Sequence, residues 1–140
     1  MRRGDKPPDL TLPDLGGNEV SLSDFKGKVV AVTFWAVYCP SCKAEIPHLR
    51  SYHKKYENED AVLLAVSLDS GPDQYLKDFA KQWGISYPIL RGDKRLCKQW
   101  RVRAIPVTYL IDQEGLIDTV YIGPEATGLL DRDTSRLLGR

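Results

Sequence analysis

The feature that most constrains the fold is the apolar run at residues 28–35 (KVVAVTFW), which ends four residues before a pair of cysteines. Its length and its β-branched residues are typical of a strand that is buried on both faces. Residues 61–68 form a second run of this kind. Between the two runs, apolar residues recur at helical spacing over residues 41–56, and Pro47 is expected to kink this helix. The strand–helix–strand order predicts parallel strands joined by a crossover helix.

Turn residues and periodicity divide the rest of the chain. Two short alternating segments on either side of Gly16-Gly17-Asn18 predict an N-terminal β-hairpin. Ser70 and Pro72 suit the N-cap and the first turn of a helix that reaches about Trp83. Further elements are predicted as strands at 87–90, 107–111 and 116–122, a short helix at 94–100 and a closing helix after Pro124. The predicted fold class is α/β, with a central mixed β-sheet flanked by helices and an added N-terminal hairpin.

Size and charge indicate one domain and exclude some kinds of partner. The 140 residues, 42% hydrophobic and 28% charged, suit one globular domain without a linker. The net charge of +1 provides no basic field to attract nucleic acid. No stretch is long and apolar enough for a membrane span, and Met1-Arg2-Arg3 is not followed by the apolar region of a signal peptide. We therefore expect a soluble domain, whose compartment is left open because a leader can be trimmed.

The chain has three cysteines, and two of them form the motif Cys39-Pro40-Ser41-Cys42. An odd number leaves at least one thiol unpaired. A structural zinc site needs about four ligands, and here a second cysteine pair is missing. His48 and His53 are five residues apart, a poor spacing for binding one metal from a helix. We therefore expect no metal site.

Two cysteines three apart in the first turn of a helix face the same side, so their sulfurs can form and break a disulfide without moving the fold. The helix N-terminus stabilises the thiolate of Cys39, which makes it the expected nucleophile, and Cys42 is the expected resolving thiol. Pro40 and Ser41 should tune the redox potential. A static disulfide or two buried thiols are the alternative. The position after a buried strand, behind the aromatic residue Trp35, favours redox chemistry.

The segment at residues 30–47, VAVTFWAVYCPSCKAEIP, resembles the active-site segment of the thioredoxin superfamily. The likeness is closest to the extracytoplasmic TlpA/ResA-like branch, of the AhpC/TSA-redoxin type. Upstream, PPDLTLPDLGGNEVSLSDFKGK resembles the hairpin that this branch adds, and downstream RVRAIPVTYLIDQEGLI resembles its cis-proline strand and the following hairpin. The resemblance implies a thioredoxin fold at residues 28–140, preceded by a hairpin extension at residues 1–27.

The resemblance also implies roles for individual residues. Trp35 matches the aromatic residue before the motif, and Pro106 matches the cis-proline, although an ordinary trans proline at a strand start is an alternative. The backbone of Ile105 would then be free to pair with a substrate strand. Glu45 matches a carboxylate common in this branch, or else is an exposed helix residue. Asp69 is either the buried acid of the branch or a helix-entry residue.

The activity that the resemblance implies is dithiol–disulfide exchange with protein substrates, without a cofactor. The expected setting is the bacterial periplasm or the outer face of the membrane, with any signal or anchor missing from this chain. There the protein would act as a monomeric reductant, for example in cytochrome c maturation. An upstream electron donor, such as a membrane thiol reductase, would keep it reduced.

Two residues depart from this pattern or lie outside it. Thr33 stands where thioredoxin has a buried aspartate, and a threonine cannot accept a proton at neutral pH. Water or another acid must then move the proton. Cys97 follows Leu96 in the predicted short helix, and we expect it to be a small core residue rather than a third redox thiol.

Two other functions are weighed against the oxidoreductase. A peroxiredoxin-like peroxidase needs the pattern P-x-x-x-[TS]-x-x-C, but the corresponding positions are Val32 and Ala36 before Cys39, and Trp35 and Cys39 before Cys42. A Cu(I)-binding module would use the two thiolates as soft ligands. No methionine-rich stretch or suitably spaced histidine accompanies them.

Overall fold

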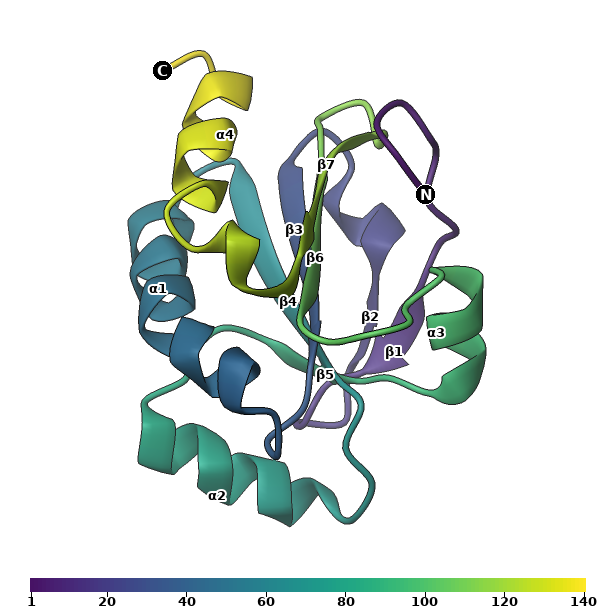
Figure 1. The fold of residues 1–140 in the computed structure, drawn as a ribbon, viewed down its shortest axis with the longest axis vertical. Helices are drawn as coiled ribbons and strands as arrows, with labels where there is room; N and C mark the ends of the chain where they lie inside the picture. The colour runs from purple at the N-terminus through teal and green to yellow at the C-terminus, as the bar shows by residue number, and fades with distance from the viewer.

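A five-stranded mixed sheet forms the centre of the molecule in a computed structural model that describes residues 1–140 (Figure 1). Its spatial order is β5-β4-β3-β6-β7, with β3, β4 and β5 parallel and with β6 and β7 antiparallel to their neighbours. The strands are β3 (Val29–Trp35), β4 (Ala61–Ser67), β5 (Ile89–Arg91), β6 (Val107–Ile111) and β7 (Ile117–Ile122). The predicted mixed sheet and the central position of β3 are confirmed.

The side chains of β3 alternate between two hydrophobic cores because successive residues of a strand point to opposite faces. Val29, Ala31 and Trp35 belong to a cluster covered by α1 (Pro40–Tyr56), α2 (Asp73–Trp83) and α4 (Leu130–Leu137). The even-numbered residues of β3, such as Phe34, belong to a second cluster. All seven residues of β3 are buried, as the continuous apolar run predicted.

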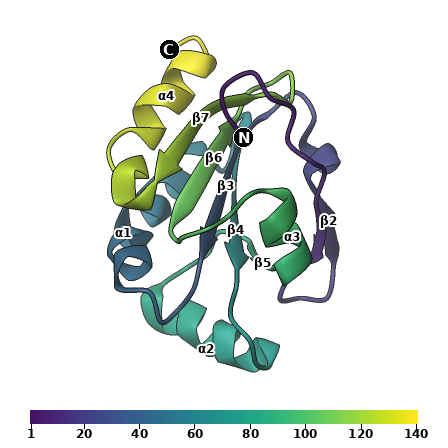
Figure 2. The ribbon, with the colours of Figure 1, turned by 45° about the vertical axis from the view of Figure 1, so that its right-hand side comes forward.

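The second core lies between the sheet and the elements on its other face, α3 (Lys94–Gln99) and the N-terminal hairpin (Figure 2). The hairpin consists of β1 (Thr11–Pro13) and β2 (Glu19–Ser21), and a 3-10 turn, η1 (Leu22–Phe25), follows it. Leu10 and Leu12 extend from this hairpin into the core, where they pack with α3 residues such as Leu96. The predicted hairpin is confirmed.

The N-terminal residues also reach the two outer strands of the sheet. Asp14 forms an antiparallel β-bridge with Leu90 of β5. Gly4 donates its N–H to Ile117 O at 2.8 Å, and Ile117 donates its own N–H to Asp5 O at 2.9 Å. The first residues are therefore hydrogen-bonded to the sheet.

Some element boundaries differ from the predictions. Helix α2 begins later than expected, with Pro72 as N-cap in an extended conformation and no capping bond from Ser70. The reason is that Gly71 has φ of 102°, which a right-handed helix cannot contain, so the helix starts after this residue. The predicted closing helix is present as α4, after a 3-10 turn, η2 (Gly123–Ala126). None of the helices has the length and apolar character that crossing a bilayer requires.

Candidate active site

The two cysteines lie where the central strand passes into the first helix. β3 ends at Trp35, and α1 starts at Pro40 with Cys39 as its N-cap. The Cys39 sulfur accepts a hydrogen bond from the Cys42 backbone N–H at 3.2 Å. The two cysteines are joined in a disulfide, with their Cα atoms 5.2 Å apart. The sulfur of Cys39 thus occupies the place where an N-cap side chain meets the positive end of a helix.

Both sulfurs are largely covered, but not equally. Cys39 is 8% exposed and Cys42 is 3% exposed. Pro40 and Ser41, between them, are exposed on the first turn of α1. Tyr38, just before the pair, is 70% exposed and presents its aromatic ring to solvent. A second molecule can therefore approach the disulfide from the side of Cys39.

The loop before β6 covers the Cys39 sulfur. The Ile105–Pro106 peptide bond is cis, and the carbonyl oxygen of Ile105 lies 3.9 Å from the Cys39 sulfur. Apart from this contact, the backbone N–H and C=O groups of residues 103–105 form no hydrogen bond within the chain. A stretch of unpaired backbone therefore lies beside the disulfide.

Asp69 is buried beneath the turn that leads to the cysteines. Its two carboxylate oxygens accept the N–H of Val37 at 3.1 and 3.2 Å, and one of them accepts the Ser67 hydroxyl at 2.8 Å. Of the two alternatives weighed for this residue, the structure shows the buried acid, because Asp69 is 8% exposed and precedes α2 by several residues. Its hydrogen bonds hold the backbone two residues before Cys39.

Glu45 is also buried, which rules out the alternative of an exposed helix residue. The side chain is 2% exposed, and one carboxylate oxygen has no hydrogen-bond partner. The other accepts the Thr127 hydroxyl at 3.3 Å. Burial raises the pKa of Glu45 from an ordinary value of 4.5 to about 7, and the Thr127 hydrogen bond offsets only part of that rise.

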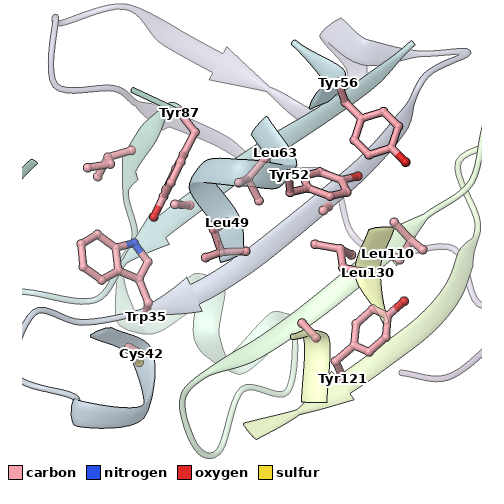
Figure 3. Close-up of a cluster of buried hydrophobic side chains, with 14 of the residues drawn as sticks. Trp35, Cys42, Leu49, Tyr52, Tyr56, Leu63, Tyr87, Leu110, Tyr121 and Leu130 are labelled. Atoms are coloured by element: carbon pink, nitrogen blue, oxygen red, sulfur yellow. The ribbon is translucent and has the colours of Figure 1, made fainter. Parts of the chain in front are cut away.

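Glu45 and Cys42 line one small internal cavity of about 10 Å³, together with Trp35 and Pro106. Figure 3 shows Cys42 and Trp35 at one end of the first core, with Tyr87 close to the indole ring. Thr33 lines the same cavity, and its hydroxyl accepts a hydrogen bond from the Thr108 hydroxyl at 2.9 Å. Glu45, Cys42 and Thr33 therefore line the same cavity, and Glu45 contributes its carboxyl group.

Cys97 was expected in the core, and this expectation was wrong. The side chain is only partly buried, because Leu96 and Trp100 occupy the inner side of α3 and Cys97 lies at its edge. Burial, together with the nearby charge of Asp93, raises the pKa of the Cys97 thiol. No group of three or more metal-ligating side chains comes together in the chain.

Comparison with known proteins agrees with this site. Residues 3–120 match the model of the AhpC/TSA family. The chain belongs to the AhpC/TSA family. Among relatives, the thioredoxin-like protein YneN of Bacillus subtilis is 33% identical over 125 residues, covering 88% of this chain and 73% of that protein. The thiol-disulfide oxidoreductase ResA of Geobacillus kaustophilus is 34% identical over 122 residues, covering 86% of this chain and 69% of that protein.

Solved structures of similar proteins establish the fold of this family member. A putative thiol:disulfide interchange protein DsbE from Chlorobium tepidum superposes with a TM-score of 0.89 at 29% identity, covering 99% of both chains. StoA from Bacillus subtilis superposes with a TM-score of 0.76 at 27% identity, covering 90% of this chain and 96% of that one. The fold is therefore the thioredoxin fold with an N-terminal hairpin. The chain is a thiol-disulfide oxidoreductase, and Cys39 and Cys42 are its C-x-x-C pair.

Proposed function

We propose that this protein reduces disulfides in other proteins, with Cys39 as the nucleophile and Cys42 as the resolving thiol. The observation that carries the assignment is the position of the Cys39 sulfur as the N-cap of α1, where it accepts the Cys42 N–H. That bond and the helix dipole stabilise a thiolate at Cys39. The greater exposure of Cys39 supports the same order of events, since its sulfur is the one that a substrate can reach.

The reaction then proceeds in two displacements. The Cys39 thiolate attacks one sulfur of the substrate disulfide, whose S–S bond breaks, and the second substrate sulfur leaves as a thiolate that takes a proton. Cys42 loses its proton and attacks the Cys39 sulfur, which releases the other substrate thiol and leaves the Cys39–Cys42 disulfide. Two electrons pass from the protein to the substrate. An upstream thiol donor must return them before the next cycle.

Glu45 is proposed to accept the proton of Cys42. Its carboxyl group and Cys42 line the same cavity, and its pKa of about 7 suits proton exchange near neutral pH. Trp35 and Pro106 form other walls of that cavity, and Ile105 offers its backbone to the substrate strand. Pro40 and Ser41 lie between the sulfurs in the first turn of α1, where they tune the redox potential.

The cellular role is proposed from the relatives, several of which are named ResA or thiol:disulfide interchange protein. We place this chain in the bacterial periplasm or on the outer face of the membrane. There it serves as a monomeric, single-domain reductant of exported proteins, with apocytochrome c as an example of a substrate. Its electrons come from a membrane thiol reductase.

Trapping of the mixed disulfide tests the function and the location together. A Cys42→Ser variant produced in the cell envelope of the native host should hold its substrate through Cys39, because the resolving step is lost. We expect covalent adducts that disappear on treatment with dithiothreitol and that contain exported proteins. A Cys39→Ser/Cys42→Ser variant is the control and should give no adducts. Adducts made only of cytoplasmic proteins would contradict the location, and an absence of adducts would contradict the function.

The buried carboxyl of Glu45 should make the stability of the oxidised protein depend on pH. Its pKa is about 7 in the folded state against an ordinary 4.5, so the folded state binds the proton more tightly than the unfolded state. This contribution to stability is fully present below about pH 4.5 and is lost as the pH rises through 7. Relative to Glu45→Gln, the free energy of unfolding of the wild type should fall by up to about 3 kcal/mol over that interval.

Urea unfolding at a series of pH values measures this difference. Glu114→Gln, at an exposed position in the turn between β6 and β7, is the matched control and should give a curve parallel to that of the wild type. A Glu45→Gln curve that also runs parallel to the wild type would show that the pKa of Glu45 is the same in the folded and the unfolded states.

A further inference from the structure

A basic segment, residues 94–103 (KRLCKQWRVR), leads into the loop whose Ile105 carbonyl oxygen contacts the Cys39 sulfur. It holds five of the chain's 20 lysines and arginines and no acidic residue. All five basic side chains are exposed, and none forms a hydrogen bond or an ion pair; they are Lys94, Arg95, Lys98, Arg101 and Arg103. The salt bridges of the chain use other cations, namely His53, Lys55, Arg91, Arg132, Arg136 and Arg140. The chain has a formal net charge of +1, so the residues outside this segment sum to −4 (+1 minus the five cations).

The basic side chains of α3 lie away from the second core. Leu96 and Trp100 fix the inner side, since both are buried in the second core. Lys94 and Lys98 are four residues apart and therefore lie on one side of the helix. Arg101 and Arg103 follow in the segment after the helix, which leads into the cis-proline loop.

Just after α3, an arginine adopts a backbone conformation that favours glycine. Arg101 has φ of 55°, the only non-glycine residue in the chain with positive φ. The N–H of Val102 donates to Cys97 O at 2.8 Å and that of Arg101 to Lys98 O at 3.2 Å, which is the hydrogen-bond pattern of a helix end that usually carries glycine at this position. An arginine is strained here. A strained residue in a loop beside a reactive site suggests that its side chain has a use.

The basic segment ends beside the reacting sulfur. Arg103 is two residues before Ile105, so its Cα lies within about 7 Å of the Ile105 Cα. Ile105 in turn contacts the Cys39 sulfur through its carbonyl oxygen. Arg103 therefore carries its charge on the loop that contacts the disulfide, and at low ionic strength, where the Debye length is about 10 Å or more, this charge acts on a polypeptide bound across the loop.

We propose that the basic segment docks an acidic stretch of the polypeptide whose disulfide is exchanged at Cys39. The proposal rests on the proposed function and adds a substrate class, namely proteins with aspartate or glutamate residues near the reacting cysteine. The unpaired backbone of residues 103–105 favours a polypeptide over an anionic membrane, because a peptide strand can satisfy those N–H and C=O groups whereas lipid chains cannot. A membrane lying here would also cover Cys39 and block its substrates.

Peptide substrates of opposite charge test this inference. Each of two peptides holds one cysteine as a mixed disulfide with thionitrobenzoate. Aspartates flank this cysteine in the first peptide, and lysines flank it in the second. The reduced protein releases thionitrobenzoate, and the absorbance change gives a rate constant for each peptide. We compare the rate constant for the acidic peptide divided by that for the basic peptide. At low ionic strength this ratio should be about tenfold higher for the wild type than for Lys94→Glu/Arg95→Glu/Lys98→Glu. The difference should shrink toward onefold in ~0.5 M salt.

A variant with the same net charge separates a local effect from a global one. Lys26, Lys28 and Lys54 are exposed and lie toward the end of the sheet opposite Cys39, and their triple replacement by glutamate should leave the wild-type ratio unchanged. Equal ratios for the wild type and the basic-segment variant would overturn the docking proposal. A second pair of results would also overturn it: the wild type binds phosphatidylglycerol vesicles and the basic-segment variant does not, while the basic-segment variant and the Lys26/Lys28/Lys54 variant give the same ratio of peptide rates. Failure of the wild type to reduce either peptide, or an uncharged disulfide, would instead refute the proposed function.

Arg101→Gly provides a test whose result cannot be attributed to loss of folding. Glycine adopts the left-handed conformation without strain, so this variant should unfold at a higher temperature, by roughly 2–4 °C. If Arg101 contributes to docking, the more stable variant should nevertheless have a lower ratio of acidic to basic peptide rates, by about twofold to threefold for one charge. A variant that is more stable and keeps the full ratio would remove Arg101 from the docking surface.

Discussion

Replacement of Cys39 by serine should abolish disulfide reduction, lowering the rate by about a thousandfold or more. A serine hydroxyl in the N-cap position can still accept the Cys42 N–H, so the start of α1 should remain intact. What is lost is the thiolate, which is the only form that attacks a disulfide at a useful rate. The measurement is the rate of thionitrobenzoate release from an uncharged mixed-disulfide peptide under conditions of a single turnover.

The matched variant is Cys42→Ser, which should behave differently. It keeps the nucleophile, so one equivalent of thionitrobenzoate should be released at close to the wild-type rate, and the protein should then stop as a mixed disulfide. The wild type passes this stage quickly because an intramolecular thiol acts at a high effective concentration. If Cys39→Ser released thionitrobenzoate and Cys42→Ser did not, the assignment of the two roles would have to be reversed.

Trp100→Ala should destabilise the protein by about 3–5 kcal/mol, a large share of the stability of a typical domain. The indole of Trp100 is completely buried in the second core, with its centroid 5.8 Å from that of Phe34 and 5.2 Å from that of Tyr109. The indole N–H has no hydrogen-bond partner, so the loss comes from packing alone. The Tyr109 hydroxyl donates to the Trp100 carbonyl oxygen at 2.6 Å, a bond that alanine retains. Urea unfolding of the oxidised protein measures the change.

Trp83→Ala is the comparison for this substitution. Trp83 is only partly buried, and it stacks on Phe79 with the ring centroids 5.4 Å apart. Its replacement should cost about 1 kcal/mol, close to the value of an aromatic pair. Similar losses for the two tryptophans would mean that the second core adjusts to close the space left by Trp100.

The elements that could be predicted from the sequence are those with a local signal. The run at residues 28–35 is apolar on both faces because β3 is central in the sheet, and this pattern is visible without any knowledge of its neighbours. The placement of Cys39 and Cys42 at a helix start follows from the same run and from the helical spacing after it. The end of α3 and the start of α2 are harder to predict from the sequence. The first depends on the positive φ of Arg101 and the second on that of Gly71.

The burial of the two carboxyl groups has no local signal. Glu45 is covered by the segment that contains Thr127, 82 residues further along the chain. Asp69 accepts a backbone N–H from a turn 32 residues earlier. For Cys97, a helix of six residues is too short for periodicity to separate its inner side from its edge. In each case the environment comes from parts of the chain that only the fold brings together.

The unequal cover of the two sulfurs also has a consequence for oxidative damage. Peroxide that reaches this site meets Cys39 first, because Cys42 is the more deeply enclosed of the two. A sulfenic acid formed on Cys39 has a thiol within one helical turn, which condenses with it, releases water and forms the disulfide. This condensation competes with further oxidation to the sulfinic acid, which thiols cannot reverse. The geometry that completes each catalytic cycle thus also protects the nucleophile from permanent inactivation.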